Sequence, residues 1–353
     1  MAKLRVLIVD DSSTARNRLC EVVAADPELA LVAAAENGKE AIECCAELRP
    51  DVVAMDMMMP VMTGVAATEY IMAYCPTPIL IVSSSTNRGE LFRTYDALAA
   101  GAVDVLEKPR GDEPEGSWEA RFLRTLKLVA RIRVITHLRG RLSSRVGPQP
   151  PPVPTPPSPH VEVVGIGAST GGPGAIVEIL RRLPHRLPVP VLLVLHLSDR
   201  FGGAFAEWLD GQTDHEVRYA RDGEAVAAAA GRIVMAPPDR HLVVRDGRLR
   251  LTDDAERHSC RPSVDVLFES LARGYGSGVA ACLLTGMGRD GAAGMLAIRA
   301  GGGTTIAQDE ATCVVFGMPR EAIALGAALH VQPLHEIGPA LAALVSASRG
   351  GQR

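Results

Sequence analysis

Short runs of apolar and β-branched residues recur along the first 110 residues of the chain, separated by stretches with helical spacing of apolar positions. Runs of this length, bounded by polar or turn residues, are typical of buried strands. Because strands alternate with helices, the pattern predicts a doubly wound parallel sheet with helices on both faces. We predict these strands: Leu4–Val9, Leu31–Ala35, Val52–Met55, Ile79–Val82 and Val103–Leu106.

The same alternation starts again near residue 161, so we predict a second α/β domain of the same class, with no internal repeat linking the two. Its expected strands are Val161–Ile166, Val191–Leu195, Arg232–Met235, His241–Val244, Val279–Leu284 and Thr304–Ala307.

A proline-rich segment separates the two patterns. Eight of the twelve residues from Pro148 to Pro159 are proline, which favours an extended spacer. Just before it, apolar residues at Trp118, Phe122, Leu126 and Val129 have helical spacing. We therefore expect a first domain over 1–115, a helix and linker over 116–160, and a second domain over 161–347.

The stretch from Arg121 to Arg145 carries eight Lys or Arg and no acid, and is either a solvated face or a docking surface for an acidic partner. The whole chain of 353 residues, 47% hydrophobic and 22% charged, has a formal net charge of -4. This balance indicates a folded protein with no global basic field for nucleic acid or a membrane surface. The first apolar run stops at Asp10, too short for a signal-peptide core or membrane helix.

The seven cysteines are scattered, and no Cys-x-x-Cys pair occurs, so the sequence indicates neither a zinc ribbon nor a disulfide framework. A reducing cytoplasm is the compartment we expect.

Polar residues follow the predicted strands of the first domain: Asp10 and Asp11, then Asp56, Ser83 and Lys108. The carboxyl ends of parallel strands meet at one sheet edge, where three carboxylates suit Mg²⁺. Asp56 is then the candidate phosphoacceptor, with the Lys108 ammonium and the Ser83 hydroxyl supporting the phosphoryl group. A cis peptide bond before Pro109 would turn Lys108 inward.

Four motifs of this first domain resemble the receiver domain of two-component response regulators: VLIVDDS at 6–12, DVVAMDMMMP at 51–60, VSS at 82–84 and KP at 108–109. The resemblance implies a flavodoxin-type strand order and Mg²⁺ bound by Asp11, Asp56 and the Met58 carbonyl, with Asp10 assisting. It also implies phosphate transfer from a sensor histidine kinase to Asp56. Thr63 departs from the pattern, in which an acid usually precedes the glycine.

The second domain opens with a strand and a glycine-rich turn, VVGIGASTGG at 163–172. A dinucleotide fingerprint, and hence an oxidoreductase, requires a third glycine where Thr170 stands and an acid where the next strand ends in His196. Such a turn can instead expose a serine at the head of a helix, whose free N–H groups bind an oxyanion.

A serine nucleophile needs a base and a group that orients the base. Ser169, His196 and Asp290 stand at three predicted strand ends, in an order that differs from that of α/β-hydrolases. Taken singly, they could be a helix cap, a core histidine and a helix-starting acid. Spacing alone leaves His241 and His258 as rival bases, and Asp265 and Asp309 as rival acids.

Several motifs of this domain resemble the chemotaxis protein-glutamate methylesterases of the CheB family: GASTGG at 167–172, RPSVDVLF at 261–268, TGMGRDG at 285–291, QDE at 308–310 and VFGMP at 315–319. The resemblance implies a Rossmann-like fold and a triad of Ser169, His196 and Asp290, with oxyanion donors at Thr170 and Met287. Leu195 departs from the family, in which glutamine usually precedes the histidine.

The resemblance also implies an activity: removal of methyl groups from glutamyl methyl esters of chemoreceptors, and deamidation of receptor glutamines. The order of domains suggests that an unphosphorylated receiver blocks the Ser169 cleft and that phosphorylation of Asp56 releases it. The alternative is a phosphorylation-switched module that binds receptors without catalysis.

Overall fold

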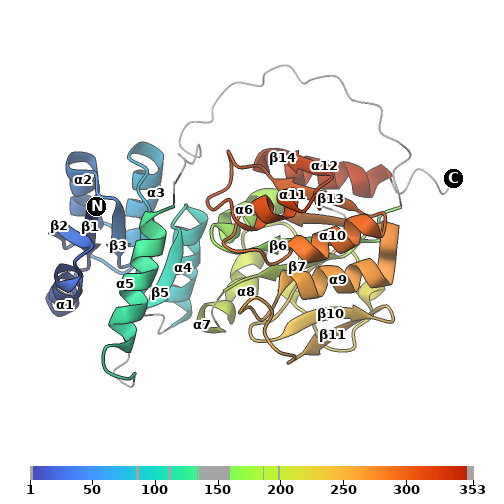
Figure 1. Ribbon diagram of the computed structural model, residues 1–353, viewed down its shortest axis with the longest axis horizontal. Coiled ribbons are helices and arrows are strands. Elements are labelled where there is room, and N and C mark those ends of the chain that lie inside the picture. Colours follow the sequence, from blue (N-terminus) through green and yellow to red (C-terminus); the bar gives the residue numbers. More distant parts are fainter. Residues whose placement is uncertain are drawn as a thin grey trace, which may run out of the picture. The chain divides into compact units, whose positions relative to one another are not determined.

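The chain divides into two units, Met1–Arg145 and Val146–Arg353 (Figure 1). The computed structural model describes residues 3–84, 87–109, 113–132, 134, 160–185, 187–197 and 199–347. The proline-rich segment 148–159 and most of the basic stretch after residue 132 lie outside the described residues.

The first unit is a five-stranded parallel sheet with the strand order β2-β1-β3-β4-β5. This order confirms the flavodoxin-type arrangement. The strands are β1 (Leu4–Val9), β2 (Leu29–Ala35), β3 (Val52–Met55), β4 (Ile79–Ser83) and β5 (Asp104–Glu107). The helices are α1 (Ser13–Ala25), α2 (Gly38–Leu48), α3 (Gly64–Tyr74), α4 (Arg88–Ala99) and α5 (Ser117–Ala130).

Side-chain caps fix where the first four helices begin. The oxygen atoms of Ser12, Asn37, Thr63 and Asn87 each accept a backbone N–H from the first turn of α1, α2, α3 and α4. Thr63, the departure from the receiver pattern, therefore has a local role as the cap of α3, with its Oγ1 3.3 Å from the Ala66 nitrogen.

Helix α5 packs on the sheet of the first unit. Trp118, Phe122, Leu126 and Val129 are its buried residues, as their spacing predicted. The Trp118 indole N–H donates to the Glu107 carbonyl at 2.7 Å, and its ring stacks on Phe122 at 5.2 Å. The expected first domain ended at residue 115 and so left α5 out. In the structure, α5 belongs to the first unit, Met1–Arg145.

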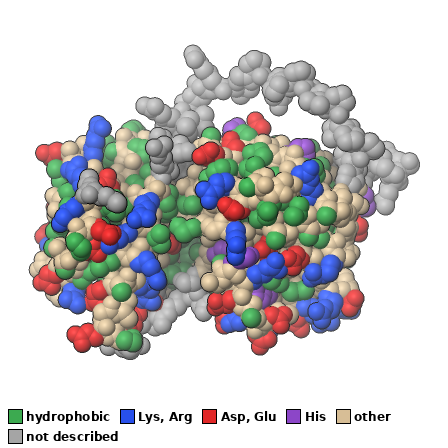
Figure 2. Space-filling view, viewed as in Figure 1, with side chains coloured by type: hydrophobic (Ala, Val, Ile, Leu, Met, Phe, Trp, Pro, Cys, Tyr) green, Lys and Arg blue, Asp and Glu red, His purple; other side chains and the backbone are tan. Residues whose placement is uncertain are grey.

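The described part of the basic stretch is partly neutralised by acids of its own unit. Lys127 forms ion pairs with Asp26 and Glu28, both at 2.8 Å, and Arg121 pairs with Glu113 at 2.9 Å. On the face shown in Figure 2, basic and acidic side chains are interspersed over both units.

The second unit is a seven-stranded sheet with the order β14-β13-β12-β6-β7-β9-β8, in which every neighbouring pair is parallel. Its strands are β6 (Val163–Ala168), β7 (Val191–Leu195), β8 (Val217–Tyr219), β9 (Ile233–Met235), β12 (Val279–Leu283), β13 (Thr304–Gln308) and β14 (His330–Gln332). Its helices are α6 (Gly172–Leu180), α7 (Asp199–Gly202), α8 (Phe205–Asp210), α9 (Val264–Tyr275), α10 (Ala292–Ala300), α11 (Met318–Ala324) and α12 (Leu334–Ala347), with 3-10 turns at Val226–Ala229 and Gly276–Gly278.

One predicted strand lies outside this sheet. β10 (His241–Arg245) pairs in antiparallel fashion with β11 (Arg248–Thr252), and the hairpin packs on α9 (Figure 1). Asp246 and Gly247 join the two strands with positive φ at both positions, which is the geometry of a type I′ turn. The expectation of a place in the parallel sheet for His241–Val244 was therefore wrong, and the Asp-Gly pair was the signal for a hairpin.

Candidate active site and phosphoacceptor site

The candidate hydrolytic residues follow three neighbouring strands of the second unit. β12, β6 and β7 are adjacent in the sheet, and their carboxyl ends lead to Asp290, Ser169 and His196. The His196 backbone N–H donates to the Ala168 carbonyl at 3.1 Å, and the Ser169 N–H donates to the Thr285 carbonyl at 3.1 Å. The sheet register thus holds the backbones on either side of Ser169 close to it.

The glycines of β6 allow a neighbouring helix to pack closely, and a glycine in the turn after β6 begins the next helix. A Cβ at Gly167 would overlap the Val264 side chain, and one at Gly165 would lie 3.0 Å from Phe268. Both contacts are with α9, so these glycines let the helix approach β6 closely. Gly171 has a φ of 75° as the N-cap of α6, a conformation that favours glycine.

Asp290 is held at the N-terminus of α9 by several donors. Its Oδ1 accepts the Ser263 hydroxyl at 2.7 Å and the Asp265 backbone N–H at 3.1 Å, and its Oδ2 accepts the Val264 N–H at 2.7 Å. Burial opposes ionisation, but hydrogen bonds from His196 and Ser263 and the helix N–H outweigh it and lower the pKa of Asp290. The carboxylate is therefore a fixed anion.

His196 faces this anion. Its Nε2 lies 2.8 Å from Asp290 Oδ2, so we assign the proton of the neutral ring to Nε2 and the lone pair to Nδ1. Burial alone would lower the pKa of His196, yet hydrogen bonds with Asp290 and Cys260 raise it to about 9. The imidazole is oriented by a carboxylate, as a general base requires.

Ser169 is partly exposed beside this pair. Within the described residues its hydroxyl makes no hydrogen bond to His196, so the structure joins two of the three predicted triad members by side-chain contact. The two N–H groups expected to bind an oxyanion, of Thr170 and Met287, donate to no acceptor in the described part of the chain. The loop that carries Met287 passes close to Ser169 at Gly286. A Cβ at position 286 would lie only 2.8 Å from Ser169 Cβ, so the absence of a side chain there permits this approach.

A cleft of about 560 Å³ opens beside these groups. It is lined by His258, Ser259, Cys260, Met287, Gly288, Arg289, Asp290, Arg320 and Glu321. Because Asp290 and Met287 line it, the cleft adjoins the candidate hydrolytic residues.

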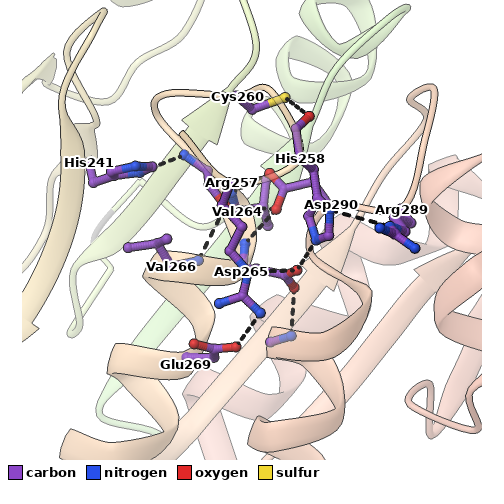
Figure 3. Close-up of polar contacts among 12 residues, drawn as sticks. His241, Arg257, His258, Cys260, Val264, Asp265, Val266, Glu269, Arg289 and Asp290 are labelled. Atoms are coloured by element: carbon purple, nitrogen blue, oxygen red, sulfur yellow. Dashed lines mark hydrogen bonds and ion pairs between the residues drawn. The ribbon is translucent and has the colours of Figure 1, made fainter. Parts of the chain in front are cut away.

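The rival bases have other partners. His241 is buried; its Nδ1 accepts the Ser263 backbone N–H at 3.1 Å, and its Nε2 donates to the Ala255 carbonyl at 3.2 Å. His258 bridges Asp265 Oδ2, 3.1 Å from its Nε2, and Arg289 Nε, 3.2 Å from its Nδ1 (Figure 3). Both histidines therefore hold the loop before α9.

The rival acids also have structural partners. Asp265 accepts the Gly294 N–H at 2.6 Å and joins α9 to α10, and Asp309 accepts the Thr312 N–H at 3.0 Å. Next to Asp309, the buried Gln308 accepts the Thr285 N–H at 2.8 Å. Gln308 thus supports the strand end that meets Ser169.

The sequence interpretation missed two side chains of this site. Ser263 donates to Asp290, and the Cys260 sulfur lies 3.7 Å from His196 Nδ1. Ser263 could have been recognised as the cap of α9, because it precedes an amphipathic helix within RPSVDVLF. No local pattern marks Cys260. Leu195, the departure beside the histidine, is buried and packs towards Gly172.

A second polar cluster lies at the carboxyl edge of the first unit. Oxygen atoms of Asp10, Asp11 and Asp56 lie within 4.8 Å of one another. Lys108 Nζ is 2.7 Å from Asp10 Oδ2 and 2.9 Å from Asp56 Oδ2. Burial raises the pKa of Asp56 despite the opposing effect of Lys108. Three carboxylates with one ammonium leave an excess of negative charge that a divalent cation fits.

The other residues predicted for this cluster are placed as follows. Ser83 at the end of β4 is buried, and its hydroxyl has no partner within the described residues, so it is available to a ligand oxygen. Met58 is exposed and its sulfur contacts Arg93. The Lys108–Pro109 bond is not cis, since Arg261–Pro262 is the one cis bond among the described residues, so that expectation was wrong. Lys108 reaches the carboxylates without it.

The sequence model of a family described as CheB methylesterase matches residues 164–341, and that of the response regulator receiver domain matches 6–114. A protein-glutamate methylesterase/protein-glutamine glutaminase of Anaeromyxobacter dehalogenans is 44% identical over 96% of both chains. The chain belongs to the CheB methylesterase family. A relative of the same name in Pseudomonas aeruginosa is 44% identical over 99% of this chain and 98% of its own.

The crystal structure of the Thermotoga maritima CheB methylesterase catalytic domain is 37% identical and covers 53% of this chain and 98% of that chain, with a TM-score of 0.49. Membership of the CheB methylesterase family confirms the resemblance indicated by the motifs of both domains. In the described part of this family member, no helix is both long and apolar enough to cross a membrane.

Proposed function

We propose that this CheB family member is a phosphorylation-activated serine hydrolase: it removes methyl groups, as methanol, from glutamyl methyl esters of chemoreceptors and deamidates receptor glutamines, for sensory adaptation. The observation that carries the proposal is the His196–Asp290 pair, 2.8 Å apart, held at the strand end next to Ser169. The naming of the relatives as protein-glutamate methylesterase/protein-glutamine glutaminase supports the choice of ester and amide.

In the proposed mechanism the Ser169 hydroxyl attacks the γ-carbonyl carbon of the substrate. Because Nε2 of His196 is bonded to Asp290, Nδ1 is the nitrogen that takes the serine proton. The same nitrogen returns the proton to the leaving methoxide, so methanol departs and an acyl-enzyme remains. Water then repeats the sequence and releases the glutamate carboxylate.

The negative oxygen of each tetrahedral intermediate needs donors that are already in place. We assign this role to the backbone N–H groups of Thr170 and Met287, which have no other acceptor among the described residues. A glutamine amide has the shape of the methyl ester and gives the same acyl-enzyme with ammonia as leaving group. Deamidation therefore requires no second site.

For the receiver domain we propose that Asp56 accepts a phosphoryl group from a sensor histidine kinase. Asp10, Asp11, Asp56 and the Met58 carbonyl would hold Mg²⁺, which offsets the charge of the carboxylates and phosphoryl oxygens. Lys108 and the unpartnered Ser83 hydroxyl would bind the transferred group. We further propose that phosphorylation relieves a block of the Ser169 cleft.

We place this activity in the cytoplasm. All seven cysteines are free thiols in the structure, which suits a reducing compartment. The chemoreceptors and the kinase are the partners that the proposal requires.

Methanol release from methylated receptor membranes tests the proposal. We expect release by the full chain, a loss of several powers of ten in Ser169→Ala, and stimulation by a small phosphodonor with Mg²⁺. Release that persists in Ser169→Ala would reject the serine mechanism. No release under any condition, together with retained receptor binding, would favour the phosphorylation-switched binding module.

A further inference from the structure

Cys260 lies next to the candidate base without a part in the proposed hydrolysis. It stands on the loop between β11 and α9, and its thiol is within 3.4 Å of the His258 carbonyl oxygen (Figure 3). The side chain is partly exposed and lines the cleft. Its sulfur is 3.7 Å from His196 Nδ1, the nitrogen that carries the lone pair when the ring is neutral.

This separation suits two ligands of one metal ion. With Zn–S near 2.3 Å, Zn–N near 2.0–2.1 Å and a tetrahedral angle, the sulfur and nitrogen of a zinc site are roughly 3.6 Å apart. The observed separation of 3.7 Å matches this value. The cleft beside Cys260, about 560 Å³, leaves room for water in the other coordination positions.

On the Nε2 side of the His196 ring lies a carboxylate, the usual partner of a metal-bound histidine. A ligating histidine donates its other ring N–H to a carboxylate, which fixes the tautomer and makes the ligating nitrogen more basic. Asp290 holds this position, 2.8 Å from Nε2. Ligand atoms of His196, Cys260 and Asp290 all lie within 4.8 Å of one another.

We propose that Cys260 and His196 form an inhibitory binding site for a thiophilic divalent cation of the Zn²⁺ type, with Asp290 as the outer partner. Thiolate and imidazole select such an ion over Mg²⁺, which prefers the carboxylate cluster of the first unit. On binding, the Cys260 thiol and the protonated His196 ring at Nδ1 each lose a proton to solvent, and the sulfur and Nδ1 form the bonds to the metal. The metal then occupies the lone pair of Nδ1.

The inhibitory effect of metal binding rests on the proposed hydrolase function, whereas the existence of the metal site does not depend on it. Once Nδ1 is coordinated it cannot take the proton of Ser169, so the hydrolase stops until the metal leaves. Only two protein ligands hold the ion, so binding is weaker than in a closed structural zinc site and reversible by chelators.

Co²⁺ serves as the spectroscopic probe, added to the full chain with Mg²⁺ in excess to fill the carboxylate cluster. We expect a thiolate-to-cobalt charge-transfer absorption in the wild type and in the control Cys20→Ser, which removes a partly exposed thiol of the first unit. The band should be absent in Cys260→Ser and Cys260→Ala. A band that persists without Cys260, or that the wild type lacks, overturns the site.

Zn²⁺ inhibition of methanol release is the second readout, with each variant normalised to its own metal-free rate. Loss of an outer-shell partner already costs 10–100-fold in affinity, so loss of the Cys260 ligand should raise the half-inhibiting Zn²⁺ concentration at least about tenfold. Equal sensitivity of Cys260→Ser and wild type would overturn the inhibitory role. If no variant releases methanol, the proposed function fails, and the cobalt spectrum still decides the site.

Discussion

Replacement of Asp290 by asparagine tests the geometry of the proposed hydrolytic site most directly. The carboxylate accepts four hydrogen bonds, two on each oxygen, from His196, Ser263, Val264 and Asp265. An amide of the same size has one acceptor oxygen and one NH₂ group. Either orientation of the substituted amide therefore turns a donor towards a donor.

The two orientations have different costs. If the NH₂ group faces His196 and Val264, the Val264 N–H loses its partner and the imidazole must accept at Nε2, which places a proton on Nδ1. If the NH₂ group faces Ser263 and Asp265, the Asp265 N–H is unpaired and the imidazolium loses its counter-charge. In both cases one buried N–H is left without a partner, which costs about 1–3 kcal/mol of stability.

We expect the Asp290→Asn substitution to lower kcat/KM for methanol release by about 10² to 10⁴, since a triad aspartate fixes the tautomer of the base. Urea unfolding followed by Trp208 fluorescence, in a Trp118→Phe background, reports the stability of the second unit alone. Asp309→Asn is the matched control, because Asp309 also follows a strand of this sheet; its activity should stay within about threefold. A loss below about threefold in Asp290→Asn, with unchanged unfolding, would refute the reasoning.

Three further results are expected. Because the pKa of His196 is raised to about 9, kcat/KM should rise with pH from 6 to 8, and a flat rate profile would contradict this. The stability contributed by the His196–Asp290 pair should be full below pH 6.5 and lost as pH rises through 9. Asp56→Asn should abolish stimulation by a phosphodonor while methanol release without the donor persists, and retained stimulation would place the phosphoryl group elsewhere. Gly286→Ala forces a methyl group against Ser169 and Met318, so it should cost about 1–3 kcal/mol in unfolding experiments and at least tenfold in rate, whereas Gly203→Ala, with open space around it, should change neither.

Much of the fold follows from local patterns. The central strands β1, β3, β4, β6, β7 and β12 were predicted within about two residues, because buried parallel strands are continuous apolar runs. β11 was missed, and so were β8 and β14. β8 (VRY) and β14 (HVQ) have three residues interrupted by polar side chains, whereas the equally short β9 (IVM) is an apolar run. β8 and β14 are recognised only by their pairing with β9 and β13.

For the sites, local patterns were enough to identify the residues that stand at the carboxyl ends of strands. Asp10, Asp56, Ser169 and His196 each follow an apolar run directly, and the parallel class of the sheet places such positions at one edge. This inference needs only the local pattern of apolar residues and the right-handed crossover of parallel α/β units.

The contacts between side chains, in contrast, came from the packed molecule. Spacing alone left Asp290 among several candidate acids, whereas the packed structure shows the N-terminus of α9 holding its carboxylate beside His196. The same fold directs His241 into the core and brings Cys260 to Nδ1 of His196. Such contacts join segments 64 and 94 residues apart, so they depend on how helices and loops close over the sheet, which no local pattern of hydrophobicity records.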